Sequence, residues 1–162
     1  MKDRLLTMTD IELTRALERG DIANESFHHL SHVHVAWVYL SESATADEAA
    51  GKMRATLQKF TSSLGHAEKY HETITVFWIR FLGHMRQINA GMSLKQVAEG
   101  NPQLLEKNFV LQYYSADLLF SDRARTSWVE PDLKALPPDA TSFCSSSSTR
   151  DPSDRLVSER AA

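Results

Sequence analysis

Residues 27–40 read FHHLSHVHVAWVYL and decide the fold. Apolar side chains recur in this stretch every three or four residues, which is the period of an amphipathic helix with one face turned to a core. Asn24 is a suitable N-cap ahead of it, Glu25 falls in the first turn, and the polar run SESATAD follows it. The sequence therefore predicts a helix from about residue 24 to residue 40.

The same period extends along most of the chain. Three further helices are predicted over residues 8–19, with Gly20 as the stop, over residues 47–64, with Gly65 as the stop, and over residues 66–88. After a short helical turn in SLKQVAEG, the run NPQLLEKNFVLQYY predicts a fifth helix, entered through Pro102. No strand-like alternation and no repeat interrupts this pattern. We therefore expect an all-α, single-domain antiparallel helical bundle.

The periodicity loosens over residues 115–138, where apolar anchors mix with Asp, Ser and Pro. We expect an irregular C-terminal strap there, with one short helix near residues 121–128. Its charged residues are expected to tie it to the bundle or to stay solvated: Asp117, Arg123, Arg125 and Asp132. From residue 139 the chain is rich in Ser and poor in large apolar residues. The predicted organisation is a bundle domain over 1–138 and a disordered Ser-rich tail over 139–162.

Composition narrows the classes of protein to consider. A chain of 162 residues with 42% hydrophobic residues forms one core. Its 18 basic and 21 acidic residues are mixed along the sequence, so we expect no nucleic-acid partner. Cys144 is the single cysteine, and the amphipathic start lacks a signal-peptide or membrane-span pattern. The expected location is the cytoplasm, with no membrane partner, while a small-molecule substrate and a homodimer stay open.

Four of the seven histidines lie in the stretch 27–40, and helical geometry separates them. His29 projects within the apolar arc of its helix, and His32 lies one turn further along, about 60° away on the helical wheel. These two imidazoles can converge on one point at the edge of the core face. His28 and His34 fall on the flanks of that arc. The sequence therefore predicts an inward H-x-x-H pair.

A third inward histidine is predicted on the helix over 66–88. His71 shares the arc of Trp78 and Phe81, which places it on the apolar face. Glu68 precedes it by three residues, and Glu72 is its direct neighbour. Either carboxylate could ligate a metal ion or accept a proton at the edge of the core, and Glu68 has the better wheel angle.

The leading interpretation is a metal centre in which His29, His32 and His71 hold one transition-metal ion. Three neutral imidazoles with one carboxylate suit Zn, Fe, Mn, Ni or Cu, and three protein ligands leave an open position for water or substrate. Glu72 or Glu68 would complete the site or move protons during a hydrolytic or redox reaction.

Two other interpretations stay open, because a core histidine is often satisfied by a backbone carbonyl or a tyrosine. The first is a metal-free enzyme in which His71 and a neighbouring glutamate form an acid/base pair in an apolar pocket. The second is a non-enzymatic interaction module in which the histidines are structural.

Two motifs resemble those of an uncharacterised family of small bacterial helical proteins. The first is F-x-H-x-x-H-V-x-x-A-W within residues 27–37, and the second is K-Y-H-E-T-x-T within residues 69–75. The late segment YYSADLLFSDRAR, with WVEPDLKALP after it, resembles the same family. The resemblance implies a site at His29, His32 and His71 with Glu72 beside it, and it implies no particular chemistry.

Overall fold

The structure is a computed structural model that describes residues 9–23 and 27–137. Within these ranges the chain forms helices and turns and no strand, which confirms the all-α prediction. The α-helices are α2 (Asp10–Arg19), α3 (His29–Ser41), α4 (Ala46–Ser63), α5 (Glu72–Ile88), α6 (Leu94–Gly100), α7 (Ala116–Leu119) and α8 (Asp122–Thr126). Three 3-10 helices lie between them: η2 (Ala67–Lys69), η3 (Pro102–Leu105) and η4 (Lys107–Gln112).

Local sequence signals explain where α2 and α4 begin and end. The Thr9 side chain accepts a hydrogen bond from the Glu12 amide, and the Glu12 carboxylate accepts one from the Thr9 amide, forming a capping box. Thr45 caps α4 in the same way through the amide of Glu48. Gly20 ends α2 at a φ of 81°, in the left-handed region that glycine adopts without strain. The helices predicted over 8–19 and 47–64 are confirmed.

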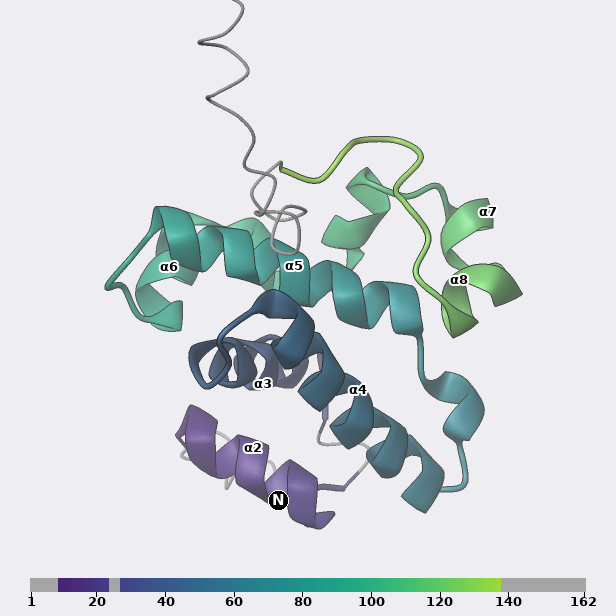
Figure 1. Cartoon of the computed structure of the whole chain (residues 1–162), viewed down its shortest axis with the longest axis horizontal. Coiled ribbons are helices and arrows are strands. Elements are labelled where there is room, and N and C mark those ends of the chain that lie inside the picture. The colour runs from purple at the N-terminus through teal and green to yellow at the C-terminus, as the bar shows by residue number, and fades with distance from the viewer. Residues whose placement is uncertain (1–8, 24–26, 138–162) are drawn as a thin grey trace, which may run out of the picture.

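The helices α3, α4 and α5 form the centre of the molecule, and the shorter elements surround them (Figure 1). α2 packs against α3 and α4, α8 packs against α5, and η3 contacts both α3 and α6. The core draws on nearly every element. Its largest fully buried side chains include Trp78, Phe77, Tyr39, Tyr114, Leu17, Met53, Leu104 and Leu119.

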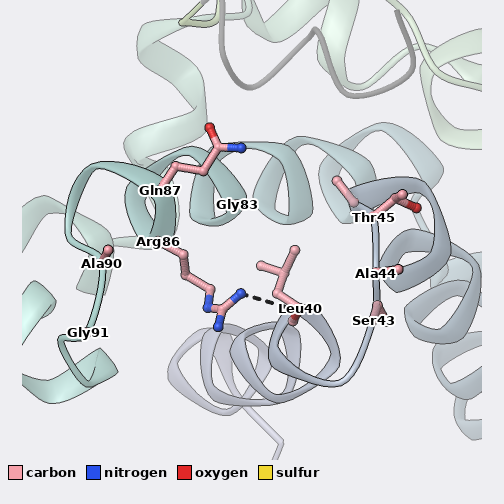
Figure 2. Close-up of a pocket in the computed structure, with 10 residues that line it drawn as sticks. Leu40, Ser43, Ala44, Thr45, Gly83, Arg86, Gln87, Ala90 and Gly91 are labelled. Carbon is pink, nitrogen blue, oxygen red and sulfur yellow. Dashed lines mark hydrogen bonds between the residues drawn. The ribbon is translucent and has the colours of Figure 1, made fainter. Parts of the chain in front are cut away.

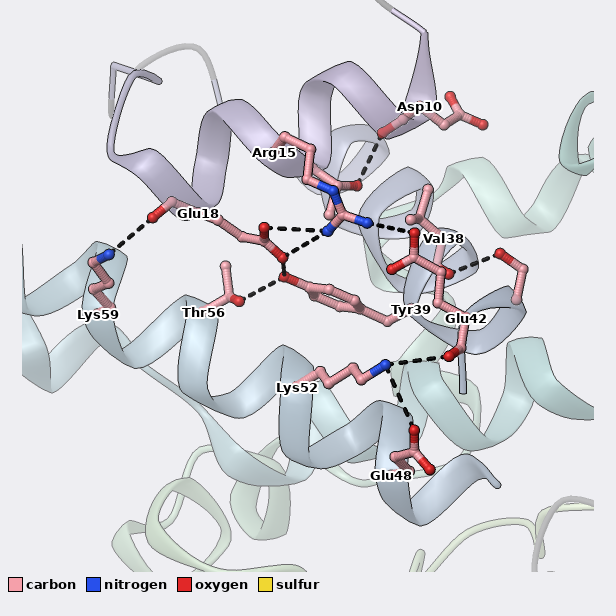
Figure 3. A network of polar contacts seen from close by, with 12 residues as sticks. Asp10, Arg15, Glu18, Val38, Tyr39, Glu42, Glu48, Lys52, Thr56 and Lys59 are labelled. Atoms are coloured by element: carbon pink, nitrogen blue, oxygen red, sulfur yellow. Dashed lines mark hydrogen bonds and ion pairs between the residues drawn. The ribbon is translucent and has the colours of Figure 1, made fainter. Parts of the chain in front are cut away.

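A polar network fastens α2 to this centre (Figure 3). The Tyr39 hydroxyl on α3 lies 2.5 Å from a Glu18 carboxylate oxygen on α2 and 2.6 Å from the Thr56 hydroxyl on α4. Arg15 forms ion pairs with both Glu18 and Glu42. The Tyr39 hydroxyl is therefore bonded to a carboxylate that belongs to a partly exposed ion-pair network. Three helices thus meet at one hydroxyl group, which fixes the position of α2.

Three predicted helices are wrong in their details. The helix predicted from about residue 24 begins only at His29, because His28 is extended and stands at its N-cap position. The segment 102–114 is not one α-helix but the two 3-10 helices η3 and η4, because tertiary packing outweighs local preference there. Phe109 packs against Phe81 at 5.1 Å between ring centroids, and Tyr113 packs against Phe77 at 5.2 Å.

The helix predicted over 66–88 is also interrupted, because Tyr70 is extended and α5 begins only after His71. The strap contains two short helices, α7 and α8, instead of one. Asn24, Glu25 and the tail over 139–162 lie outside the described residues.

Candidate functional site

His71 is the N-cap of α5, and both of its ring nitrogens are engaged. Nδ1 accepts a hydrogen bond from the Ile74 amide at 3.2 Å, so Nε2 carries the proton and donates it to the Leu119 carbonyl oxygen at 2.7 Å. Burial is the largest influence on the ring and lowers the pKa of His71 below its usual value. The imidazole is therefore neutral, held in one tautomer, and links the start of α5 to α7.

His29 lies in the first turn of α3 and packs on the core. Its Nε2 is 3.1 Å from the Leu104 carbonyl oxygen of η3, and its ring centroid lies 4.8 Å from that of Trp78. Burial lowers the pKa of His29. The prediction that this side chain faces inward is consistent with these contacts, and its partner is a backbone carbonyl.

His32 lies one turn further along α3 and has a different environment. Its Nε2 is buried and has no hydrogen-bond partner among the residues that the structure describes. The Phe27 ring lies 6.1 Å away between ring centroids. Burial, and then the proximity of His29, lowers the pKa of His32 to about 4. His32 is thus a neutral imidazole at physiological pH, as a metal ligand would be.

The three predicted metal ligands are not brought together into one ligand group. His29 and His71 point at carbonyls of two different segments, Leu104 in η3 and Leu119 in α7. In the part of the chain that the structure describes, no group of three or more His, Cys, Asp or Glu side chains is placed to hold a metal ion. Metal binding by His29 and His32 stays a prediction, and His71 is not placed with them.

The two predicted carboxylates line a polar cleft of about 780 Å³ instead. The cleft is bounded by the second half of α4, by η2, by the start of α5 and by the strap from α8 onward. Its lining comprises Arg54, Gln58, Thr61, Ser62, Ala67, Glu68, Tyr70, Glu72, Arg125, Thr126, Ser127 and Trp128. Charged side chains of α4, η2, α5 and α8 therefore line the same recess.

Glu72 is tied into this cleft by two neighbours. Arg54 donates to both carboxylate oxygens, from Nε at 2.9 Å and from Nη2 at 2.6 Å. The Tyr70 hydroxyl donates to Oε1 at 2.6 Å. Burial acts to raise the pKa of Glu72, but the hydrogen bonds from Arg54 and Tyr70 outweigh it and hold the pKa below its usual value. The Glu72 carboxylate is therefore held in one position, and Arg54 and Tyr70 occupy most of its hydrogen-bond acceptor sites.

Arg125 of α8 stands on the strap side of the cleft. It donates from Nη1 to the Glu68 carbonyl oxygen at 3.1 Å, a contact between α8 and η2. Its Nε is buried and has no hydrogen-bond partner within the described ranges 9–23 and 27–137. A buried guanidinium N–H without an acceptor is destabilising, and none of the described residues accepts a hydrogen bond from this one.

Trp128 gives the cleft its aromatic surface. The Arg80 guanidinium lies over its ring at 4.6 Å from the centroid, and its Nε1 donates to Glu130 at 2.6 Å. The ring is also held edge-on by Tyr114, with 6.4 Å between centroids. These contacts fix the indole on the cleft wall.

The acid/base pair expected of His71 and a neighbouring glutamate is not favoured by this geometry. Both His71 nitrogens are bonded to backbone groups, and Glu72 is neutralised by Arg54. Glu68 is exposed and faces His66 at 3.4 Å. Neither the His71 ring nor the Glu72 carboxylate is therefore free to accept a proton from a ligand in the cleft.

Sequence reasoning missed Arg54 and Tyr70 as site residues. Arg54 lies among polar positions of α4, and nothing local marks it as the partner of a carboxylate 18 residues away. Tyr70 is next to the histidine motif, and its extended backbone brings the hydroxyl back to Glu72. The sequence signal that could have found Arg54 is the pairing of a basic residue on one helix with the acidic first turn of the next.

Comparison with family models, with curated proteins and with solved structures finds no match for this chain. No helix within the described residues is long and apolar enough to cross a membrane. The resemblance between the two histidine motifs and a bacterial family stays a prediction.

Proposed function

We propose that this protein binds a small organic anion in the cleft between α4, α5 and α8. The observation that carries the proposal is Arg125, a cleft-lining cation whose guanidinium donates to a backbone carbonyl and to no carboxylate among the described residues. A carboxylate or phosphate group in the cleft would supply the negative charge that this cation lacks. Guanidinium groups are well suited to this, since their planar N–H groups match two oxygens of an oxyanion.

The charges lining the cleft favour the same kind of ligand. Arg54 and Arg125 are both cationic, and Glu72 balances only the first of them. Glu68 is largely exposed, so water screens its carboxylate from the recess. The four charges of the lining sum to zero, so the attraction for an anion is local, at the Arg125 guanidinium, which no carboxylate of the described residues pairs with. Glu72 and Tyr70 hold the Arg54 guanidinium in place, so that less conformational entropy is lost when the ligand binds.

The size and the lining of the cleft suggest a ligand larger than an inorganic ion. A volume of about 780 Å³ falls within the usual range for small-molecule sites. Trp128 offers an aromatic surface, while Gln58 and Ser62 offer neutral hydrogen-bonding groups. An anionic group at the arginines with a planar apolar part near Trp128 would use both features.

Calorimetric titration with phenyl phosphate and with its neutral analogue benzyl alcohol tests the proposal. We expect saturable binding of phenyl phosphate and none of benzyl alcohol. Arg125→Gln should weaken binding by about tenfold or more, because it removes a charge-assisted hydrogen bond. Arg54→Gln should weaken it as well, which provides a second variant if the first does not fold.

Arg123→Gln is the matched control, because Arg123 is an exposed arginine of the same helix, α8, and does not line the cleft. It should bind phenyl phosphate like the unmodified protein. Equal affinity of Arg125→Gln, Arg54→Gln and Arg123→Gln would show that the anion binds elsewhere and would overturn the proposal.

A further inference from the structure

The lining of the cleft between α4, α5 and α8 contains few hydrogen-bond donors that a ligand could use. Five lining residues carry a hydroxyl group, and four of these hydroxyls already donate within the protein. Thr61, Thr126 and Ser127 each donate to a carbonyl oxygen one turn back at 3.0 Å. Tyr70 donates to Glu72 at 2.6 Å. While these bonds are kept, the four oxygens can accept a hydrogen bond from a ligand but cannot donate one.

The charges of the lining leave one cation for an anionic ligand. Arg54 donates from Nε and from Nη2 to Glu72, so this pair is locally neutral. Arg125 donates to the Glu68 carbonyl oxygen and forms no ion pair with a carboxylate of the described residues. The Glu68 carboxylate, although largely exposed, adds a second negative charge to the lining. A ligand with one negative charge balances Arg125, whereas a second charge on the ligand would be repelled by both carboxylates.

The supply of donors and the balance of charge both favour a carboxylate over a phosphate. The two oxygens of a carboxylate can accept from two N–H groups of a single guanidinium, which also balances its one charge. A phosphate monoester has three terminal oxygens and a charge of about −1.5 to −2 at neutral pH. Its third oxygen would need a further donor, and the neutral donors left in the lining are the Gln58 amide and the Ser62 hydroxyl, both on α4. A carboxylate therefore matches Arg125 better than a phosphate does.

Trp128 determines the shape of the group that can lie beside this carboxylate. The Arg80 guanidinium lies 4.6 Å from its ring centroid but does not line the cleft, so the indole surface that borders the cleft is not the surface that Arg80 covers. The Nε1 hydrogen is donated to Glu130, which leaves the ring itself as an apolar contact surface. A flat aromatic ring packs well on such a surface.

We infer that the ligand of this cleft is an aryl carboxylate, a planar aromatic acid with one negative charge, whose carboxylate binds Arg125 and whose ring packs on Trp128. The inference rests on the proposed function and narrows the ligand from organic anions in general to one class. Arg125 and Trp128 are three residues apart on the strap side of the cleft, so the charge and the aromatic surface lie on the same wall. A phosphate ester such as phenyl phosphate would use the same two groups less well.

The test is a calorimetric titration of the full chain with benzoate, with phenyl phosphate and with the neutral analogue benzamide. We expect benzoate to bind about tenfold more tightly than phenyl phosphate, and we expect no saturable binding of benzamide. Cyclohexanecarboxylate, which keeps the charge but lacks the flat ring, should bind about threefold more weakly than benzoate. The indole N–H signal of Trp128 should shift in an NMR titration with benzoate.

The charge argument is tested by Glu72→Gln, a substitution of nearly the same shape. It leaves Arg54 as a second cation without a carboxylate partner, so the affinity for phenyl phosphate should rise about fivefold or more relative to that for benzoate. Glu68→Gln removes the exposed carboxylate, and it should move the same ratio in the same direction by a smaller factor. This second variant keeps the test decisive if Glu72→Gln does not fold.

Arg86 provides a matched control, because it is an arginine that lines a different recess. That recess has a volume of about 320 Å³ and lies at the opposite end of α5, and its lining includes no aromatic residue. Arg86 donates there to the Leu40 carbonyl oxygen at 3.3 Å (Figure 2). Arg86→Gln should bind benzoate like the unmodified protein, whereas Arg125→Gln should bind it about tenfold more weakly or worse.

The outcomes that overturn the inference differ from those that overturn the proposed function. Phenyl phosphate binding as tightly as benzoate, or binding alone, would overturn the aryl carboxylate and leave the anion site standing. Equal affinity for benzoate and cyclohexanecarboxylate would show that no flat ring is recognised and would also overturn it. The absence of binding by both benzoate and phenyl phosphate would overturn the inference and the proposed function together.

Discussion

At the scale of single residues, His32 is the group whose protonation the fold opposes most strongly. Its pKa is about 4 in the folded protein and 6.5 for a free histidine. Below pH 6.5 His32 is therefore mostly protonated in the unfolded chain, whereas in the folded chain it stays mostly neutral until the pH approaches 4. The contribution of neutral His32 to the free energy of unfolding is fully present above pH 6.5. It is lost as the pH falls from 6.5 to about 4.

This difference predicts an acid-sensitive stability to which His32 makes the largest single contribution among the described histidines. The free energy of unfolding should fall by up to about 3 kcal/mol between about pH 6.5 and pH 4 through His32 alone. Urea unfolding at several pH values measures it, and His32→Gln should have a smaller slope because glutamine cannot be protonated, while the lowered pKa values of His29 and His71 keep part of the slope. His66→Gln is the control, since His66 is exposed, and it should keep the full slope. An equal slope in His32→Gln would contradict the prediction.

At the scale of elements, the start of α5 depends on a histidine used as a cap. His71 satisfies the Ile74 amide and at the same time reaches the Leu119 carbonyl of α7. One ring thereby performs two tasks, the capping of a helix and the attachment of the strap. Asparagine or aspartate would perform only the first, because each is too short to make both contacts.

Substitution at His71 separates these two tasks. His71→Ala should lower the free energy of unfolding by about 2 kcal/mol, because it removes the cap and leaves two buried backbone groups unpaired. His71→Asp should recover about 1 kcal/mol of this loss, since aspartate restores the cap but not the bond to Leu119. Urea unfolding of both variants at pH 7 measures the difference. Equal stability of the two variants would mean that capping contributes nothing at this position.

The elements also show which features a sequence can reveal. The bounds of α2 and α4 follow from Thr9, Gly20 and Thr45, whose effects are local. The inward direction of His29 follows from the helical period. Its hydrogen-bond partner is a carbonyl 75 residues away in the sequence, and no local pattern predicts that contact. The break between η3 and η4 likewise depends on aromatic packing. Local sequence signals predicted the helix ends that local hydrogen bonds determine. They did not predict the features that long-range tertiary contacts determine.

At the scale of the whole molecule, the strap is part of the core. Leu119, Ala124, Val129 and Leu136 are buried, and they belong to the same apolar cluster as the side chains of α3, α4 and α5. The Tyr114 hydroxyl donates to the Val129 carbonyl at 2.6 Å, and the Thr73 hydroxyl donates to the Ser127 carbonyl at 2.8 Å. The segment that forms one wall of the cleft is therefore stabilised by the same packing that stabilises α5.

This shared core predicts that damage to the strap destabilises the entire fold. Leu119 is 0% exposed in a four-residue helix, so Leu119→Ala should lower the free energy of unfolding by about 2–5 kcal/mol. Leu133→Ala is the control, because Leu133 is 59% exposed in the same strap, and it should change stability by less than about 0.5 kcal/mol. Far-ultraviolet circular dichroism reports the long helices, and near-ultraviolet circular dichroism reports the aromatic core. Both signals should shift to one lower midpoint in Leu119→Ala, because a single core unfolds cooperatively. A variant that loses the near-ultraviolet signal first, with the helices intact, would show that the strap folds onto an independently stable centre.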